Sequence, residues 1–237
     1  MTTALEQSPR VAAPATLRQI ELLHKVKTGT LPLRIPICDR QGAETGRLAP
    51  LTQAHLGDEA LVSTFVRWRN QYREGWLDQR PVTIEGTHRW LREVVVDPTR
   101  MSFLIYFGAQ PIGRCGFLNL SAEENESDGL VRGERGGGAD FMHCANVAGL
   151  AWQFNALGIF AAYSKVLSSN GFALEGCRRL GYPATPFATR EVYRHEDPQG
   201  AVLRETGSAE QKLPDTRLLY LRIHEVDFNR ALERWRN

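Results

Sequence analysis

The sequence lacks several features that mark special classes of protein. No run approaches the ~18 consecutive apolar residues of a membrane-spanning helix, so we expect no membrane span. Neither sign of charge dominates, because 29 lysine and arginine residues stand against 27 aspartate and glutamate residues. A net charge of +2 creates no field that would attract nucleic acid or an anionic membrane, so any anion site must be local.

Cysteine is also scarce. The four cysteines are widely spaced, form no C-x-x-C pair and do not group with histidines at the intervals of metal ligands. The first residues contain no apolar segment of the kind found in secretory signal peptides. We therefore expect a reduced, cytoplasmic protein that uses no metal.

The chain does have enough apolar material for a sizeable core, since 42% of its 237 residues are hydrophobic. We expect one main domain over residues 45–237, after an N-terminal extension at 1–44. Residues 1–15 are rich in Ala, Thr, Pro and Gln and predict disorder, whereas 16–27 predict a short amphipathic docking helix. Whether that helix makes a homodimer stays open.

Hydrophobic periodicity and turn residues predict alternating helices and strands. Helices are expected at 58–72, at 83–96 with Thr83 as the cap, at 139–157 ending at Gly158, and at 171–182. Strands are expected as a pair near 31–39 and 46–52, as a hairpin at 102–108 and 111–120, and singly at 128–133, 160–170 and 217–226. We expect an acidic loop at 122–127 and a polar excursion at 195–211.

One stretch concentrates glycine and positive charge directly before an amphipathic helix. Residues 130–141, LVRGERGGGADF, contain four glycines and two arginines. Because the first turn of a helix has unpaired N–H groups and the positive end of the macrodipole, such an entry suits a phosphate. No Gly-Lys-Ser/Thr follows, and no G-x-G-x-x-G lies in a strand-helix-strand unit, which excludes the two commonest nucleotide motifs. The alternative is a flexible loop.

Three stretches, together with the order of the elements, carry a resemblance to a known superfamily. They are WRN at 68–70, LVRGERGGGADFM at 130–142, and VLSSNGFALEGCRRLGY at 166–182. In these the chain resembles the GNAT N-acetyltransferases. The resemblance implies an α/β (α+β) single domain with a mixed, mostly antiparallel central sheet, helices on both faces and one splayed pair of parallel strands.

The resemblance also implies an activity. We expect an acyl-CoA-dependent N-acyltransferase that moves acetyl from acetyl-CoA to an amino group of a small molecule, such as a nucleotide-linked amino sugar. The alternatives are a protein N-terminus or an amino acid as acceptor, an acyl carrier protein as donor, or a catalytically silent acyl-CoA-binding protein. No metal, nucleic acid or membrane partner is implied.

The same resemblance assigns the donor site to the second half of the chain. Backbone groups of Leu130 and Val131 would pair with the pantetheine amides, and Asn170 would contact the pantetheine arm besides capping its helix. Arg132 and Gly133 would end the splayed strand. The helix start that follows would bind the pyrophosphate through Gly136, Gly137, Gly138 and Ala139.

Candidate catalytic residues flank this site. Asp128 and Glu126 are two apart, so they share one face of a regular strand, and either carboxylate could take a proton from an amine. The alternative is solvated surface. Cys177 stands seven residues after Asn170, where many relatives have a tyrosine acid; its thiol could donate a proton, or it could fill space as a small hydrophobe.

The acceptor side is expected in the first two helices of the main domain. Arg69 could hold a phosphate or carboxylate in a bidentate manner, and the resemblance places Asn70 and His88 beside the acceptor. The alternative for Arg69 is a surface salt bridge. His88 could be a hydrogen-bonded structural histidine, and Trp68 and Trp90 are expected in the core.

Overall fold

One nine-stranded sheet organises the protein. The computed structural model describes residues 13–205 and 211–237, and its strand order is β1-β2-β3-β4-β5-β6-β9-β7-β8. Among the described strands only β5 and β6 pair in parallel. The strands are β1 (Ile35–Cys38), β2 (Glu44–Pro50), β3 (Met101–Phe107), β4 (Gln110–Leu118), β5 (Glu124–Arg132), β6 (Ala161–Leu167), β7 (Ala188–Asp197), β8 (Gly200–Arg204) and β9 (Gln211–His224).

Six α-helices accompany the sheet in the described part of the chain. They are α1 (Leu17–Lys27), α2 (Glu59–Gln71), α3 (Ile84–Val96), α4 (Phe141–Trp152), α5 (Gly171–Leu180) and α6 (Glu225–Arg236). The expected cap of α3 is confirmed, because the Thr83 side chain accepts from the Gly86 N–H. A π-helical turn follows α4, and Gly158 ends it in a left-handed conformation with φ 66°.

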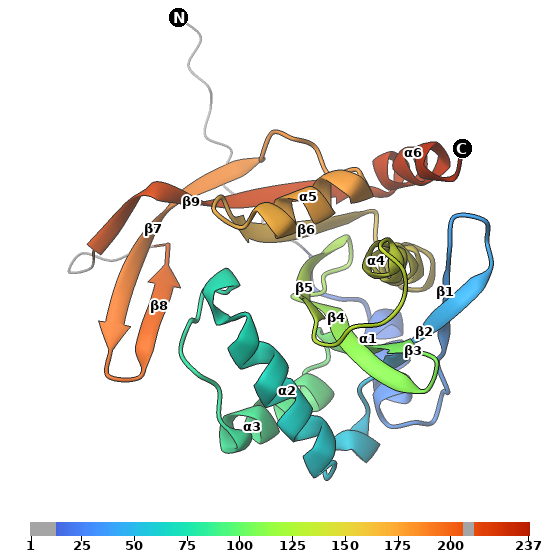
Figure 1. Cartoon of the computed structure of the whole chain (residues 1–237). Helices are drawn as coiled ribbons and strands as arrows, with labels where there is room; N and C mark the ends of the chain where they lie inside the picture. The colour runs from blue at the N-terminus through green and yellow to red at the C-terminus, as the bar shows by residue number, and fades with distance from the viewer. Residues whose placement is uncertain (1–12, 206–210) are drawn as a thin grey trace, which may run out of the picture.

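The helices form two layers around the sheet (Figure 1). Helices α2 and α3 pack on one face, where Phe65, Trp68 and Leu91 meet Leu104 of β3 and Val131 of β5. Helices α1, α4, α5 and α6 contribute to the larger core on the other face. The expected fold class is therefore confirmed. No helix among the described residues is long and apolar enough to cross a membrane.

The segment expected as an N-terminal extension packs on the main core. Residues 1–12, most of the stretch expected to be disordered, lie outside the described residues. Leu23 and Val26 of α1 are buried, and β1 pairs with β2 at the edge of the sheet. The Lys27 ammonium donates to the Asp97 carbonyl at the end of α3. Helix α1 thus docks on its own chain.

Two predictions made from polarity are wrong. The expected acidic loop is mostly strand, because β5 begins at Glu124 and pairs with β4 from Glu126 onward. The expected polar excursion is largely the β7–β8 hairpin. Both segments belong to a sheet whose exposed faces are polar, so only a few buried residues, such as Val192 and Leu203, mark the hairpin. Helix α6 was not predicted.

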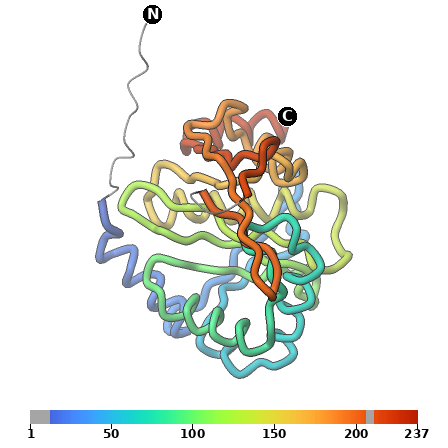
Figure 2. The backbone as a smooth tube through the Cα atoms, turned by 90° about the vertical axis from the view of Figure 1, so that its left-hand side faces the viewer, coloured from blue at the N-terminus to red at the C-terminus, as the bar shows by residue number. Residues whose placement is uncertain are grey.

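The β7–β8 hairpin holds the connection between α2 and α3. Gln79 N–H donates to the Ala201 carbonyl at 2.9 Å, and Asp78 forms an isolated antiparallel bridge with Val202. Arg80 binds Asp78 and also reaches Asp197 of β7. Figure 2 shows the hairpin descending beside this connection. Residues 78–80 of this connection are thereby tied to the hairpin.

Candidate active site

The parallel strands β5 and β6 pair only at their beginnings. Their register runs from Glu124↔Ala161 to Glu126↔Tyr163 and then stops. Strand β5 continues to Arg132 against β4, while β6 continues to Leu167 against β9. The backbone groups of β5 that face the gap after this point therefore have no strand partner.

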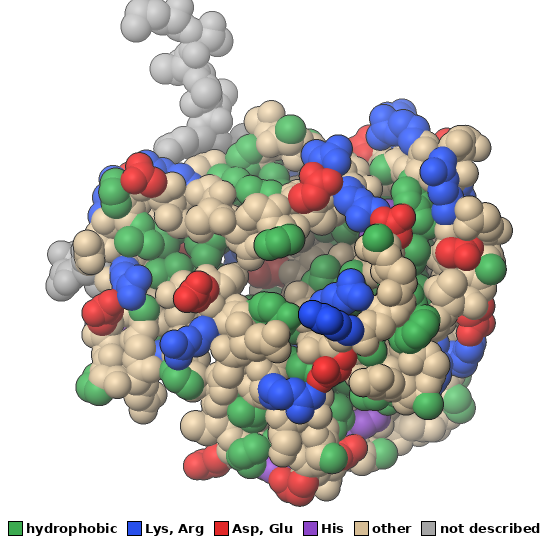
Figure 3. Space-filling model, viewed as in Figure 1, with side chains coloured by type: hydrophobic (Ala, Val, Ile, Leu, Met, Phe, Trp, Pro, Cys, Tyr) green, Lys and Arg blue, Asp and Glu red, His purple; other side chains and the backbone are tan. Residues whose placement is uncertain are grey.

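A bulge lies three residues beyond the last parallel pair. The β4–β5 register shifts between Arg114 and Gly116, opposite Gly129, whose φ is +67°. Glycine occupies this left-handed conformation without strain, and bulges of this kind bend a strand. The space-filling view shows a hollow between α5 and α2, with Lys or Arg side chains on its rim (Figure 3).

A chain of polar side chains spans the gap from strand to strand. The Tyr182 hydroxyl lies 3.2 Å from the Ser127 hydroxyl of β5 and accepts from the Ser164 hydroxyl of β6 at 3.4 Å. Cys177 of α5 also hydrogen-bonds Ser164. Burial raises the pKa of Tyr182 to about 12 and that of Cys177 to about 11, so both are protonated at neutral pH.

Tyr182 was missed as a functional candidate. Its only signal in the sequence was its place at the end of the Leu-Gly-aromatic pattern, which gives no hint of the two serine contacts. Those contacts come from strands 37 residues apart in the chain. Cys177 itself is buried with 8% exposure and packs in the large core with Leu180.

The glycine turn, residues 133–140, connects β5 to α4. Gly133 and Glu134 both donate their N–H groups to the Ile112 carbonyl, at 2.8 and 3.0 Å. The Arg132 guanidinium donates to the Gly136 carbonyl at 2.8 Å and so folds the turn. No described residue accepts a hydrogen bond from the N–H groups of residues 136–139. These donors lie directly before the positive end of α4.

The glycines of this turn differ in their surroundings. A Cβ on Gly133 would lie 2.1 Å from the Trp68 indole, so this glycine is required by packing. Gly137 has φ +69°, and a Cβ there would lie 2.4 Å from Phe141. Gly138 faces open space, with nothing within 4 Å of a Cβ. Gly138 is thus the position where a side chain would meet a ligand and not the protein.

The acidic residue beside the turn points away from it. Asp140, the N-cap of α4, makes no capping hydrogen bond and pairs instead with Arg179 of α5 at 2.6 Å. An anion at the N–H groups would therefore meet a neutralised carboxylate. Next to the turn, a groove of about 580 Å³ runs along the end of α2. It is lined by Arg67, Gln71, Tyr72, Arg132, Gly133, Glu134 and Arg135.

The remaining residues expected at the donor site occupy both sides of the gap. Leu130 is 44% exposed, whereas the Val131 side chain is buried against α2, so only its backbone can face a ligand. Asn170 caps α5 by accepting from the Ala173 N–H at 3.1 Å. Its amide nitrogen also donates to the Gly75 carbonyl at 3.4 Å, which joins α5 to the connection after α2.

The two candidate carboxylates share the face of β5 that looks toward α2 and α3, but their partners differ. Glu126 accepts from Asn119 at 2.8 Å and from Tyr163 at 3.1 Å, and it pairs with Lys165 at 3.2 Å. Asp128 has one longer ion pair, with Arg100 at 3.4 Å. Glu126 is therefore fully engaged, whereas Asp128 retains acceptor capacity.

The three residues expected on the acceptor side are not all brought together. Arg69, in the last turn of α2, donates to the Asp78 carbonyl and stacks 4.5 Å from the Trp76 ring. The Asn70 amide is used by the backbone of Val82, accepting at 2.8 Å and donating at 3.0 Å.

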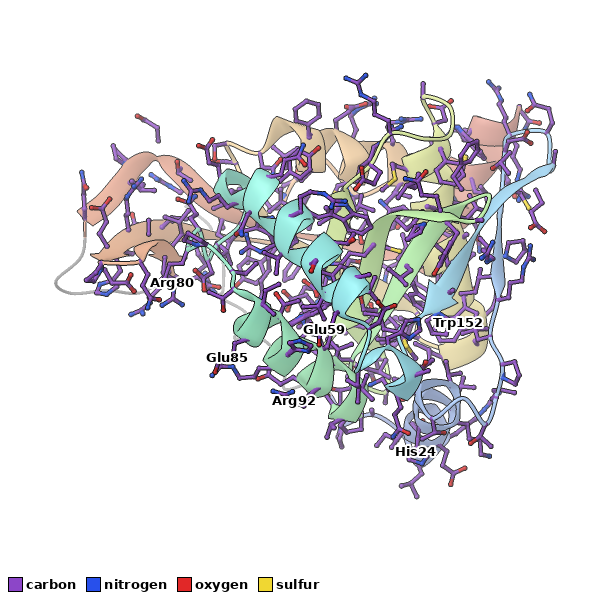
Figure 4. All side chains as sticks on the ribbon, turned by 60° about the horizontal axis from the view of Figure 1, so that its bottom comes forward. His24, Glu59, Arg80, Glu85, Arg92 and Trp152 are labelled. Atoms are coloured by element: carbon purple, nitrogen blue, oxygen red, sulfur yellow. The ribbon has the colours of Figure 1, made fainter. Side chains whose placement is uncertain are left out.

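The structure places His88 elsewhere, beside Glu59 at the opposite end of α2, with 3.1 Å between their side chains. Figure 4 shows Glu59 at that end. Ten residues of helix separate Glu59 from Arg69, about 15 Å along the axis. Trp68 is buried as expected, and Trp90 packs at the edge of the same core.

Comparison with known proteins gives matches in structure alone. No protein-family model matches the chain, and no curated protein matches its sequence. A GCN5-related N-acetyltransferase from Brucella melitensis matches with 15% identity over 88% of this chain and 90% of its own, at TM-score 0.56. The acetyl transferase of Salmonella typhimurium that modifies the N-terminal serine of a 50S ribosomal subunit protein matches with 13% identity, 81% and 99% coverage, and TM-score 0.60.

The spermidine N-acetyltransferase of Vibrio cholerae, solved with CoA and spermine, matches with 12% identity over 78% of this chain and 98% of its own, at TM-score 0.58. Identities this low show a shared fold. The chain has the fold of the GCN5-related N-acetyltransferases, as its three sequence stretches indicated.

Proposed function

We propose that this protein is an acyl-CoA-dependent N-acyltransferase that transfers acetyl from acetyl-CoA to an amino group. The observation that carries the proposal is the gap between β5 and β6, which opens directly ahead of a turn with unused N–H groups. A separated strand offers unpaired amides to an extended polar chain, and the turn offers donors to a phosphate. Coenzyme A has both an extended polar chain, the pantetheine arm, and phosphate groups, in its pyrophosphate.

The residues present fit this donor. The N–H groups of residues 136–139 would hold the pyrophosphate, and the backbone of Leu130 and Val131 would pair with the pantetheine amides. Asn170 would contact the arm from the other side of the gap. When bound, acyl-CoA supplies the thioester carbonyl that an amine attacks and the thiol that leaves.

The groups that would transfer protons lie on the two sides of β5. Asp128 would take the proton from the acceptor amine, since Glu126 already accepts from three neighbours. On the other face, Tyr182 and Cys177 hold protons at their oxygen and sulfur atoms, connected through Ser164. This chain of side chains would return a proton to the gap.

The acceptor we propose is a small amine, of which a nucleotide-linked amino sugar is one example. Arg69 would bind its anionic part. Related structures are described as acting on a protein N-terminus and on spermidine, so those acceptors are the natural alternatives. A catalytically silent acyl-CoA-binding protein is the alternative without chemistry.

The donor site is tested by calorimetric titration of acetyl-CoA into the wild type and into Gly138→Val. We expect the valine to lower affinity at least about tenfold, which corresponds to about 1.4 kcal/mol, because it fills the space at the N–H groups. Gly57→Val is the matched control, since a Cβ there also meets nothing within 4 Å and the residue lies before α2. Equal affinity of the folded Gly138 variant would refute the assignment.

The reaction is tested by following release of free thiol from acetyl-CoA with a panel of amines. Turnover that depends on the amine supports the transferase. Tight binding of acetyl-CoA without turnover on any amine or peptide N-terminus would support the silent binding protein instead.

A further inference from the structure

Three arginines and two tryptophans from separate elements lie together near Asp128 of β5. We call this group the arginine cluster: Arg69 of α2, Arg100 before β3, Arg114 of β4, Trp76 and Trp90. The Arg69 guanidinium lies 4.5 Å from the Trp76 ring, and Arg114 lies 4.8 Å from the Trp90 ring. Arg114 also approaches Trp76, at 5.7 Å, so this ring contacts two guanidinium groups.

The backbone of β5 is shaped around one of these arginines. A Cβ on Gly129 would lie 2.4 Å from the Arg114 Nη1 atom and 2.7 Å from its Cζ atom. The guanidinium therefore rests on the bare backbone of the bulge, with aromatic rings beside it. Stacking on aromatic faces fixes the plane of a guanidinium and leaves its edges free to bind an anion.

The charges within the cluster do not balance. Asp128 pairs with Arg100 and is the carboxylate that acts on both Arg69 and Arg114. The nearby Asp78 carboxylate is bound by Arg80, at 2.8 Å. Three positive side chains thus share the Asp128 carboxylate, and Asp78, which also acts on Arg69, is held by Arg80. The Nη1 atoms of Arg69 and Arg114 are buried and have no hydrogen-bond partner among the described residues.

Buried guanidinium donors without partners are costly, so proteins normally supply an anion or a hydrogen-bond acceptor for them. We propose that Arg69 and Arg114 form an oxyanion subsite for the acceptor, which is a small amine that also carries a carboxylate or a phosphate. The inference rests on the proposed acyl transfer and names the class of its acceptor. Two Nη1 donors beside one tryptophan ring suit the two oxygens of such a group.

The electrostatics favour this class over a polyamine. Burial lowers the pKa of Arg69 to about 10 and also lowers that of Arg114. Both groups stay charged at neutral pH, but burial removes water from the charges and so costs free energy. An anion would relieve that cost, whereas a polycation would add to it. Asp128, next to the cluster, would then face the amino group of the same molecule.

The first experiment tests the subsite without any turnover. Inorganic phosphate and, separately, glutarate are titrated into the protein while the tryptophan fluorescence is recorded. We expect saturable binding of one of the two anions, and which anion binds shows whether the subsite takes a phosphate or a carboxylate. In Arg69→Gln and in Arg114→Gln we expect the affinity for that anion to fall about tenfold or more. Arg92→Gln is the control, because Arg92 lies on the outer face of α3 (Figure 4). Arg114→Lys is a second variant, which keeps the charge and loses the planar donor pair.

The second experiment compares amines that differ in the anion. The pairs are ethanolamine with O-phosphoethanolamine, and cadaverine with lysine. We expect kcat/KM to be about tenfold or more higher for the anionic member of one pair, and this preference to disappear in Arg114→Gln. No anion binding in a folded wild type, or equal preference in all variants, would overturn the subsite. Anion binding that depends on Arg69 and Arg114, with no amine turned over, would instead leave the subsite standing and reject the transferase.

Discussion

The two sides of the gap are built from different materials. The proposed donor side is backbone: glycine N–H groups at the start of α4 and unpaired amides of β5. The proposed acceptor side is side chains: the guanidinium groups and indole rings of the arginine cluster, with Asp128 paired to Arg100. In the proposed transferase, backbone groups would bind the parts that all acyl-CoA molecules share, whereas the side chains could differ with the acceptor. We therefore propose that the α2 and α3 side sets the specificity for the acceptor.

The largest effect is expected where the two sides meet. Asp128→Asn should lower turnover by roughly 10²-fold or more and leave acetyl-CoA affinity nearly unchanged, because the amide cannot take a proton from the amine. Initial rates and calorimetry on the same preparation check this. Glu85→Gln on the outer face of α3 is the control (Figure 4). A full rate in Asp128→Asn would move the role to Glu126 or to solvent.

The same contrast explains what could be predicted from the sequence. The glycine turn and its helix are contiguous, so residues 130–141 by themselves predict a phosphate site, which the proposed function adopts. Arg114, Trp76 and Gly129 converge only after β4, β5 and the connection after α2 fold together. No local pattern shows that convergence. Arg69 and His88 were both chosen because they lie in stretches that resemble the superfamily. The structure places Arg69 beside Trp76 and His88 at the other end of α2, and the role of Arg69 stays a prediction.

Strand prediction failed for a related reason. Residues 124–127 and 195–204 carry the charges of exposed strand faces. Residues 124–126 pair with β6, whose residues lie 37 positions further along the chain, and 195–197 pair with the other strand of a polar hairpin. Alternation with a buried face, the usual sign of a strand, is weak there.

The next prediction separates the two kinds of glycine on the donor side. Gly133→Ala should destabilise the fold by about 1–3 kcal/mol, because its Cβ would collide with the Trp68 indole in a packed core. Gly138→Ala should leave stability almost unchanged. Urea unfolding of both variants measures the difference. Equal stabilities would mean that the Gly133 backbone is not held against Trp68.

The stability of the fold should also depend on pH through a buried histidine of α4, the helix that follows the glycine turn. His143 of α4 packs on Trp235, and burial, with Arg179 nearby, lowers its pKa to about 4 although Asp140 acts in the opposite direction. As the pH falls, the His143 imidazole takes up a proton in the unfolded chain before it does so in the folded chain. The stability that the neutral imidazole contributes is therefore fully present above pH 6.5 and is lost as the pH falls toward 4. Melting temperatures of the wild type should therefore fall more steeply over this range than those of His143→Gln. Parallel curves would assign the loss to other groups.

A smaller effect is expected from the hydroxyl that joins the strands of the gap. Tyr182→Phe removes the contacts to Ser127 and Ser164, and each such hydrogen bond is worth about 1 kcal/mol. We expect the two lost contacts to lower stability by about 1–2 kcal/mol and to reduce turnover several-fold, with the affinity for acetyl-CoA little changed. Chemical unfolding and initial rates test it. Unchanged turnover in the folded variant would make Tyr182 a structural residue only.

The smallest effect is expected at Cys177, because in the proposed mechanism its buried thiol would share the protonation role with Tyr182. Cys177→Ala should slow turnover per folded molecule by a few-fold, since one proton donor is lost. Cys177→Tyr should retain or raise turnover, because a phenol restores the group that the superfamily resemblance implies at this place. The large ring should also overpack the core and lower the melting temperature. Comparing turnover with melting temperature separates chemistry from packing. An alanine variant with full turnover per folded molecule would eliminate the acid role and leave Cys177 as a residue that fills space beneath α5.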